Sequence, residues 1–196
     1  MSLNKIILFA VISCMFIQCN VKDVKKEISD SEKFAQEYPF VGGDNIFIYR
    51  NAAETADILE KGRGIVFIGF KECSWCQLYA VFLHVAARDM EIDKIYYCDI
   101  KEDRENNSES YQRIIGILSG HLQYDDEGRP RLYVPDVSIV NRGRIIARDF
   151  ETSKETLGYN TPQEYWNEER MNALIERLRS GIDILKQLIG RECNEC

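Results

Sequence analysis

The sequence has few of the residues on which metal and nucleic-acid chemistry depend. Only two of its 196 residues are histidines, His84 and His121, so a histidine-rich metal centre is difficult to assemble. Its 25 lysines and arginines are outnumbered by 32 aspartates and glutamates, and the formal charge of -7 argues against the basic surface of a nucleic-acid binder. We therefore expect no metal, no cofactor and no nucleic-acid partner. Any catalysis should depend on cysteine or carboxylate groups.

Cysteine is present without being abundant. Seven cysteines are too few for a small disulfide scaffold, because a chain of this length that is 45% hydrophobic can bury a core of its own. The length suits one domain, alone or with a tail. The positions of the cysteines, more than their number, should therefore show what they do.

Residues 1–19 have the pattern of an export signal. A polar start that contains Lys5 is followed by an apolar run over residues 6–17 and then by polar residues. About twelve apolar residues are too few to cross a bilayer core of about 30 Å, so cleavage is favoured over a retained transmembrane helix. The stretch resembles a bacterial lipoprotein signal, in which cleavage precedes a cysteine that is then lipidated.

Two cysteines are candidates for this lipidation. Cys14 follows a small residue, Ser13, as the lipoprotein pattern requires, whereas Cys19 follows Gln18 but lies at the boundary between apolar and polar sequence. A plain signal peptide or a retained hydrophobic anchor is the alternative interpretation. All of these interpretations place the rest of the chain outside the cytoplasm, in the bacterial cell envelope, where disulfides can persist.

The remainder of the chain divides into three parts. Residues 20–44 are charged and weakly periodic, as expected of a tether that becomes helical towards its end. Residues 45–190 alternate between strand and helix patterns and form the predicted folded domain. Residues 191–196 form a short tail that contains Cys193 and Cys196.

The patterns within the folded domain predict an α/β protein. An asparagine cap at Asn51 with Glu54 three residues later starts a helix that should end at Gly62. A continuous apolar run then predicts a strand that is buried on both faces. The expected strands are 46–49, 64–70, 94–100, 131–140 around a proline, and 145–147 after a hairpin turn, and the expected helices are 51–62, 77–90, 110–118 and one long helix from Thr161 to Ile189.

The sequence Cys73-Ser74-Trp75-Cys76 lies between the buried strand and the helix that follows it. The start of a helix has unpaired N–H groups and a positive dipole end, which stabilise a thiolate there. We therefore interpret Cys73 as a nucleophile and Cys76 as the residue that attacks the mixed disulfide formed at Cys73. Half of a zinc site and an inert structural disulfide are the alternatives.

The order of these elements around a Cys-x-x-Cys motif resembles the thioredoxin fold, a central mixed β-sheet flanked by helices. The resemblance covers residues 45–189 and implies a cis proline at Pro135 that packs against the disulfide. It also implies that the backbone of Val134 pairs with a bound substrate chain, and we expect Trp75 to contact substrate as well. The motifs at 67–73 and 96–100 are similar to those of thioredoxin-like proteins related to bacteriocin transport accessory proteins.

The sequence departs from the thioredoxin pattern near the motif. Thioredoxins have a buried aspartate six residues before the first cysteine, where this chain has Phe67, and a tryptophan immediately before that cysteine, where this chain has Glu72. The carboxylate of Asp136, next to the predicted cis proline, is our candidate proton acceptor. The alternative is that Asp136 caps a turn.

Three further cysteines lie outside the Cys73–Cys76 motif in the rest of the chain after the signal segment. Cys98 lies in an apolar strand, where a free cysteine usually acts as a small hydrophobic residue. Cys193 and Cys196 end the chain as a second Cys-x-x-Cys that follows a helix, so the helix dipole does not activate them. They could form a local disulfide, exchange electrons with the first pair, or join it in metal binding.

These patterns together predict an exported, lipid-anchored thiol–disulfide oxidoreductase. Its partners would be protein or peptide thiols and disulfides, a separate redox partner, and a membrane that it contacts through its lipid or signal segment. The alternative is a non-catalytic interaction or secretion-accessory module with a structural disulfide. The motif specifies neither the direction of electron transfer nor the substrate.

Overall fold

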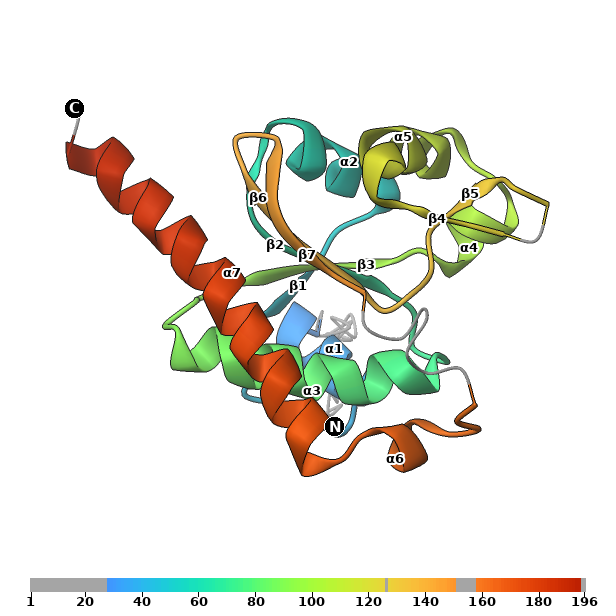
Figure 1. Cartoon of the computed structure of the whole chain (residues 1–196), viewed down its shortest axis with the longest axis horizontal. Coiled ribbons are helices and arrows are strands. Elements are labelled where there is room, and N and C mark those ends of the chain that lie inside the picture. Colours follow the sequence, from blue (N-terminus) through green and yellow to red (C-terminus); the bar gives the residue numbers. More distant parts are fainter. Residues whose placement is uncertain (1–27, 126, 151–157, 195–196) are drawn as a thin grey trace, which may run out of the picture.

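A mixed five-stranded sheet forms the centre of the molecule (Figure 1). The structure is a computed structural model that describes residues 28–125, 127–150 and 158–194. In spatial order the strands are β1 (Phe47–Tyr49), β3 (Ile95–Asp99), β2 (Arg63–Gly69), β6 (Asp136–Asn141) and β7 (Arg144–Asp149). The first three are parallel to one another, and β6 and β7 are antiparallel to their neighbours. The predicted α/β class and mixed sheet are therefore confirmed.

Helices cover both faces of this sheet (Figure 1). One face carries α1 (Asp30–Glu37), α3 (Ser74–Asp89) and α7 (Glu168–Asn194), and the other carries α2 (Ala52–Lys61) and α5 (Glu109–Leu118). The shorter elements are α4 (Lys101–Glu105), the 3-10 helix η1 (Ser119–His121), α6 (Pro162–Tyr165) and a two-stranded ribbon of β4 (Gln123–Tyr124) and β5 (Pro130–Arg131).

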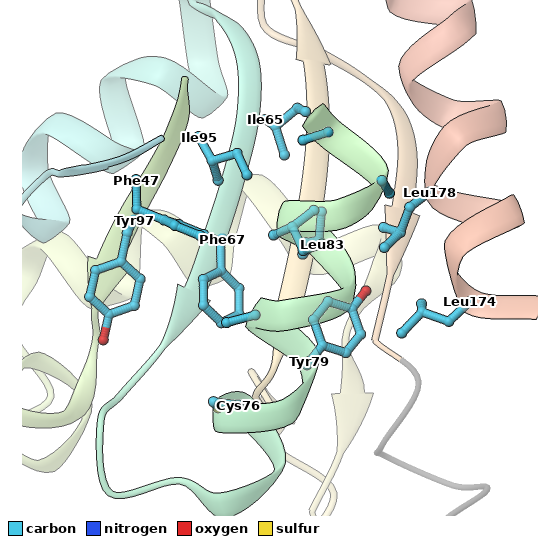
Figure 2. Packing of buried hydrophobic residues seen from close by; sticks show 14 of the residues in the cluster. Phe47, Ile65, Phe67, Cys76, Tyr79, Leu83, Ile95, Tyr97, Leu174 and Leu178 are labelled. Atoms are coloured by element: carbon cyan, nitrogen blue, oxygen red, sulfur yellow. The ribbon is translucent and has the colours of Figure 1, made fainter. Parts of the chain in front are cut away.

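The apolar run in β2 supplies both faces because successive strand residues point to opposite sides. Ile65 and Phe67 join the cluster under α1, α3 and α7, which Figure 2 shows in part, while Val66 and Ile68 join the cluster under α2 and α5. All four side chains are fully or almost fully buried. The predicted central strand thus contributes side chains to both hydrophobic cores, one on each face of the sheet.

The helix predicted after Asn51 forms with the expected cap. The Asn51 side chain accepts a hydrogen bond from the backbone N–H of Glu54, whose carboxylate accepts one from the backbone N–H of Asn51. The helix ends at Lys61, and Gly62 follows as its C-cap. Local sequence therefore suffices to define this element.

The folded part begins before the predicted boundary at residue 45. Ser29 and Glu32 form a capping box at the start of α1. Phe34 and Tyr38 are fully buried, and Phe34 stacks on Phe47 of β1 at 3.9 Å between ring centroids. The predicted tether over residues 20–44 is helical towards its end, as expected, but α1 packs into the core and is part of the folded domain.

The C-terminal region also differs from its prediction. The backbone of Trp166 is extended, and the side chain of Asn167 accepts a hydrogen bond from the N–H of Arg170, so α6 and α7 are separate helices. Helix α7 then continues through the predicted tail to Asn194. Its last turn is held by Glu192, which pairs with Arg63 and, at 3.0 Å, with Arg142.

Two smaller predictions need correction. The predicted strand over residues 131–140 is interrupted, because β6 begins only at Asp136 and residues 132–135 are irregular. The segment between the predicted strand 94–100 and the predicted helix 110–118 contains a further short helix, α4. The predicted hairpin is confirmed, since Arg142 and Gly143 both adopt positive φ, at 52° and 74°.

We predict that Gly143→Ala destabilises the fold more than Gly128→Ala. Both glycines have φ near +75°, where an added Cβ costs about 1 kcal/mol. Gly128 has open space around it, whereas a Cβ at Gly143 would lie 1.8 Å from the carbonyl oxygen of Glu60. Displacing the hairpin from α2 should add about 1–3 kcal/mol. Urea unfolding of both variants measures the difference, and equal losses would show that the contact with Glu60 is unimportant.

Candidate active site

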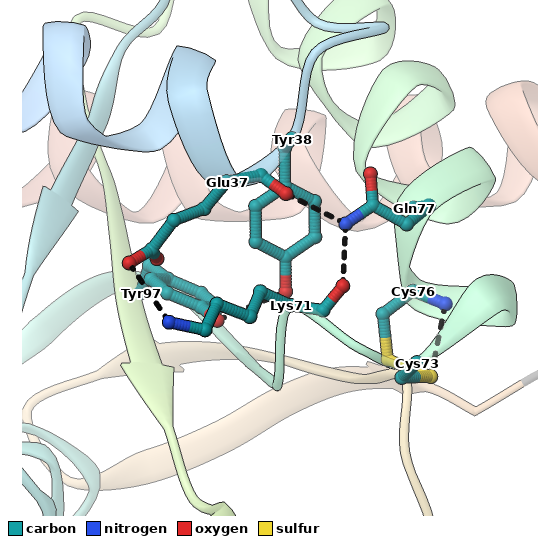
Figure 3. Close-up of a disulfide and its surroundings, with 7 residues drawn as sticks. All are labelled: Glu37, Tyr38, Lys71, Cys73, Cys76, Gln77 and Tyr97. Atoms are coloured by element: carbon teal, nitrogen blue, oxygen red, sulfur yellow. Dashed lines mark hydrogen bonds and ion pairs between the residues drawn. A yellow bond between two sulfur atoms is a disulfide. The ribbon is translucent and has the colours of Figure 1, made fainter.

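Cys73 and Cys76 lie where the buried strand β2 turns into α3. Strand β2 ends at Gly69, α3 begins at Ser74, and Cys73 is the N-cap residue of that helix. The two cysteines form a disulfide with 5.2 Å between their Cα atoms (Figure 3). The Cys73 sulfur also accepts a hydrogen bond from the backbone N–H of Cys76, at 3.1 Å. The predicted position of Cys73 at a helix N-terminus is confirmed.

The two sulfurs differ in their access to solvent. Cys73 is 9% exposed, whereas Cys76 is fully buried. Gly69 makes room for the inner sulfur, because a Cβ at that position would lie only 3.2 Å from Cys76 Sγ. In the reduced protein the N–H of Cys76 and the helix dipole would both favour the thiolate at Cys73. Because Cys73 is the more exposed of the two, an external thiol or disulfide would react with Cys73 first.

A network of polar contacts holds the loop that precedes Cys73 (Figure 3). The side-chain amide of Gln77 donates to the carbonyl oxygens of Glu37 and Lys71, both at 2.7 Å. The ammonium of Lys71 lies 3.7 Å from the carboxylate of Glu37. These contacts join the end of α1 to the first turn of α3. The sequence did not indicate that α1 supports the site.

Aromatic residues lie where thioredoxins have a buried acid. Phe67 is paired in register with Tyr97, and the hydroxyl of Tyr97 lies 2.9 Å from that of Tyr38. Burial raises the pKa of Tyr38 and of Tyr97 far above the usual phenol range, so both phenols stay neutral. Neither one can act as the base that Phe67 fails to supply.

Asp136 forms its polar contacts with Arg148 and Ser138 and not with the cysteines. Its carboxylate forms a buried ion pair with Arg148 and accepts a hydrogen bond from Ser138 at 3.4 Å. Its register partner on β2 is Ile68, which belongs to the core under α2 and α5, whereas Cys76 belongs to the opposite core. The contacts of Asp136 thus differ from both sequence interpretations, the proton acceptor and the turn cap.

We predict that Arg148→Met strongly destabilises the protein at neutral pH. The substitution leaves Asp136 buried without its cation, which costs about 3–5 kcal/mol. Burial already raises the pKa of the Asp136 carboxyl, and losing Arg148 raises it further. The folded variant then binds a proton at Asp136 more readily than the unfolded chain does. The loss in free energy of unfolding relative to wild type should therefore shrink as the pH falls towards about 4. Denaturant unfolding at pH 7 and pH 5 tests this, with the exposed Arg144→Met as control. A deficit independent of pH would contradict the explanation.

The three predicted substrate-contacting residues have distinct surroundings. Trp75, on the first turn of α3, is half-buried, and its ring lies 5.7 Å edge-on from that of Tyr165. The peptide bond between Val134 and Pro135 is cis, as the resemblance implied, and it immediately precedes β6. Val134 is partly buried and packs against both cores, while Pro135 is buried.

The other cysteines and the histidines lie elsewhere. Cys98 is a free, buried thiol whose pKa is raised to about 12 by burial, which agrees with its predicted role in the core. His84 is on α3 and His121 ends η1. Cys193 lies within α7, so it is not in a tail, whereas Cys14, Cys19 and Cys196 are outside the described residues.

The sequence interpretation overlooked Asp99, the last residue of β3. It is paired in register with Gly69, beside the disulfide. Burial and the neighbouring carboxylates of Glu72 and Glu37 raise the pKa of Asp99, while the backbone N–H of Lys101 opposes that shift. The sequence does hold one indication of this site: Asp99 is a charged residue at the end of an otherwise apolar strand.

We compared the chain with known protein families, curated proteins and solved structures. We found no significant match to the chain among protein-family models, curated proteins or solved structures. Within residues 28–125, 127–150 and 158–194, no group of three histidine, cysteine or acidic side chains is arranged to hold a metal ion. In the same part of the chain no helix has the length and apolar character needed to cross a membrane.

Proposed function

We propose that the protein is a thiol–disulfide oxidoreductase that uses Cys73 as nucleophile and Cys76 as resolving cysteine on protein or peptide disulfides. The observation that carries this proposal is the asymmetry of the pair. Cys73 caps α3, accepts an N–H bond and is 9% exposed, whereas Cys76 is fully buried one turn further on. A purely structural disulfide requires neither the helix N-terminus nor this difference in access.

We also propose that the fold is thioredoxin-like. Three features support this: the β2–α3–β3 parallel crossover that follows the motif, the antiparallel β6–β7 hairpin, and the cis bond before Pro135. Helix α1 precedes that arrangement, and α7 closes it. In such a fold, Val134 and Trp75 would border the bound substrate segment.

The proposed location is the bacterial cell envelope. It depends on the export pattern of residues 1–19, with Cys14 or Cys19 as the lipidated residue, and these residues lie outside the described part of the chain. An oxidising compartment suits a protein whose chemistry is disulfide exchange.

Cys76→Ser is expected to trap a mixed disulfide between Cys73 and substrate, because the resolving thiol is absent. Reduced variant protein would be mixed with oxidised glutathione, quenched with acid and digested, and the adduct located by peptide mass spectrometry. The matched Cys73→Ser variant should carry no adduct at Cys76, which is buried. Adducts on neither variant would favour the non-catalytic interaction module with a structural disulfide.

A further inference from the structure

We infer that Asp99 accepts the proton of Cys76 when Cys76 attacks the mixed disulfide at Cys73. This inference rests on the proposed function and concerns its second step. Asp99 is the register partner of Gly69, and a Cβ on Gly69 would lie 3.2 Å from Cys76 Sγ. Neighbouring strands are about 4.8 Å apart, so an aspartate side chain at this position can extend towards the Cys76 thiol and accept its proton directly or through one water.

The side chain of Asp99 is on the correct face of the sheet. Tyr97, two residues earlier on β3, belongs to the same hydrophobic cluster as Cys76, and residues two apart on a strand share a face. Cys98 and Ile100 belong to the opposite cluster. Asp136, in contrast, lies opposite Ile68 on that other face. Of these two aspartates, Asp99 is the one on the same face of the sheet as Cys76.

The surroundings of Asp99 suit a proton acceptor. One carboxylate oxygen accepts the backbone N–H of Lys101 at 3.1 Å, which leaves the other oxygen with acceptor capacity. The side chain also lines an open hollow with Glu72, Lys101 and Glu102, so a proton taken from Cys76 has a route to solvent.

The charged and titratable groups around Asp99 come from several elements. They are Glu37 from α1 and Tyr38 just after it, Tyr49 from β1, Lys71 and Glu72 from the loop before Cys73, Tyr97 from β3, and Lys101, Glu102, Asp103 and Glu105 from α4. The carboxylates and burial raise the pKa of Asp99, and this brings its basicity closer to that of a thiol. The neutral phenols do not compete for the proton, because burial raises their own pKa.

The reaction consists of two successive thiol–disulfide exchanges. The Cys73 thiolate attacks a substrate disulfide, a Cys73–substrate S–S bond forms, and one substrate thiolate leaves. Asp99 then takes the proton of Cys76, the Cys76 thiolate attacks Cys73 Sγ, and the bond to substrate breaks. The Cys73–Cys76 disulfide forms and the second substrate thiolate leaves. The substrate has gained two electrons and the protein dithiol has lost two.

Asp99→Asn tests the inference because asparagine can still accept the N–H of Lys101 but cannot take a proton. Reduced full-length protein would be mixed with oxidised glutathione, acid-quenched at successive times, and the Cys73–glutathione adduct followed by peptide mass spectrometry. We expect the adduct to form at the wild-type rate and to decay about 100-fold more slowly, the lower range of general-base effects. Asp99→Glu should restore much of the decay rate.

The pH dependence separates a proton acceptor from a structural cap. In wild type the decay rate should fall as the pH drops through the pKa of Asp99, because the carboxylate form is required. In Asp99→Asn the decay rate should instead depend on ionisation of the Cys76 thiol itself. It should rise with pH up to the pKa of an ordinary thiol, about 8.5. Glu102→Gln is the matched control, since it removes a negative charge from the same hollow at an exposed position and should leave the decay unchanged.

Each outcome decides a different claim. If Cys76→Ser forms no Cys73 adduct and wild type forms no Cys73–Cys76 disulfide with oxidised glutathione, the proposed function is overturned. Adduct decay in Asp99→Asn with the wild-type rate and pH profile would overturn the role of Asp99 alone, and so would equal slowing in Glu102→Gln. If Asp99→Asn does not fold, Asp99→Ser, which also retains an acceptor for Lys101, is put through the same measurement.

Discussion

Cys73→Ser is expected to reduce the thiol-dependent reduction of insulin disulfides to the rate seen without protein. Cys73 is the outer sulfur of the pair, and its position at the start of α3 provides the stabilised thiolate. Cys76 cannot replace it, since Cys76 is fully buried. The loss should therefore be complete, and it should appear in the rate constant without a change in folding, which circular dichroism can check.

Cys98→Ala provides the matched control for this loss. Cys98 is a free thiol in the core under α2 and α5, on the opposite face of the sheet from Cys76. Removing it should leave the insulin-reduction rate unchanged. Wild-type protein as inactive as Cys73→Ser, together with retained binding of a partner, would contradict the enzyme proposal and favour the interaction module.

Phe34→Ala should lower the free energy of unfolding by about 3–5 kcal/mol, as expected for truncating a buried phenylalanine. Phe34 is fully buried and stacks on Tyr38 and Phe47, with ring centroids 4.3 and 3.9 Å apart. The loss would show that α1 belongs to the folded unit and is not a tether. Guanidinium unfolding followed by fluorescence gives the measurement.

Phe40→Ala is the control for this substitution. Phe40 lies only six residues from Phe34 along the chain but is 66% exposed, so its removal should change stability by less than about 0.5 kcal/mol. Similar stabilities for Phe34→Ala and Phe40→Ala would mean that α1 contributes little to the core.

Sequence patterns predicted the elements whose signals are local. The continuous apolar run of β2, the Asn51 cap and the hairpin turn at Arg142-Gly143 each specify their structure within a few residues. Helix α1 was misinterpreted because its many charged residues suggested a solvated tether. Its Ser29–Glu32 capping box and the apolar pair Phe34 and Tyr38, four residues apart, were the overlooked signals.

The candidate site was only partly predictable for the same reason. The Cys-x-x-Cys motif and the strand–helix junction are contiguous, so the sequence places Cys73 and Cys76 correctly. The acidic neighbour depends on strand register and on which face of the sheet a residue occupies. Asp136 is adjacent to the cis proline in sequence but pairs with Arg148, whereas Asp99 comes beside Gly69 through the pairing of β3 with β2. Long-range pairing of this kind leaves no local pattern.

Cys73 and Cys76 should form a reversible redox couple in the folded protein. Equilibration of the protein with dithiol and disulfide buffers, followed by acid quenching and mass determination of the peptide that contains both cysteines, measures its reduction potential. We expect a two-electron transition with a midpoint between about -270 and -120 mV, the range of thiol–disulfide oxidoreductases. A disulfide that stays oxidised in the folded protein at buffer potentials below about -300 mV would be structural, and would contradict the claim.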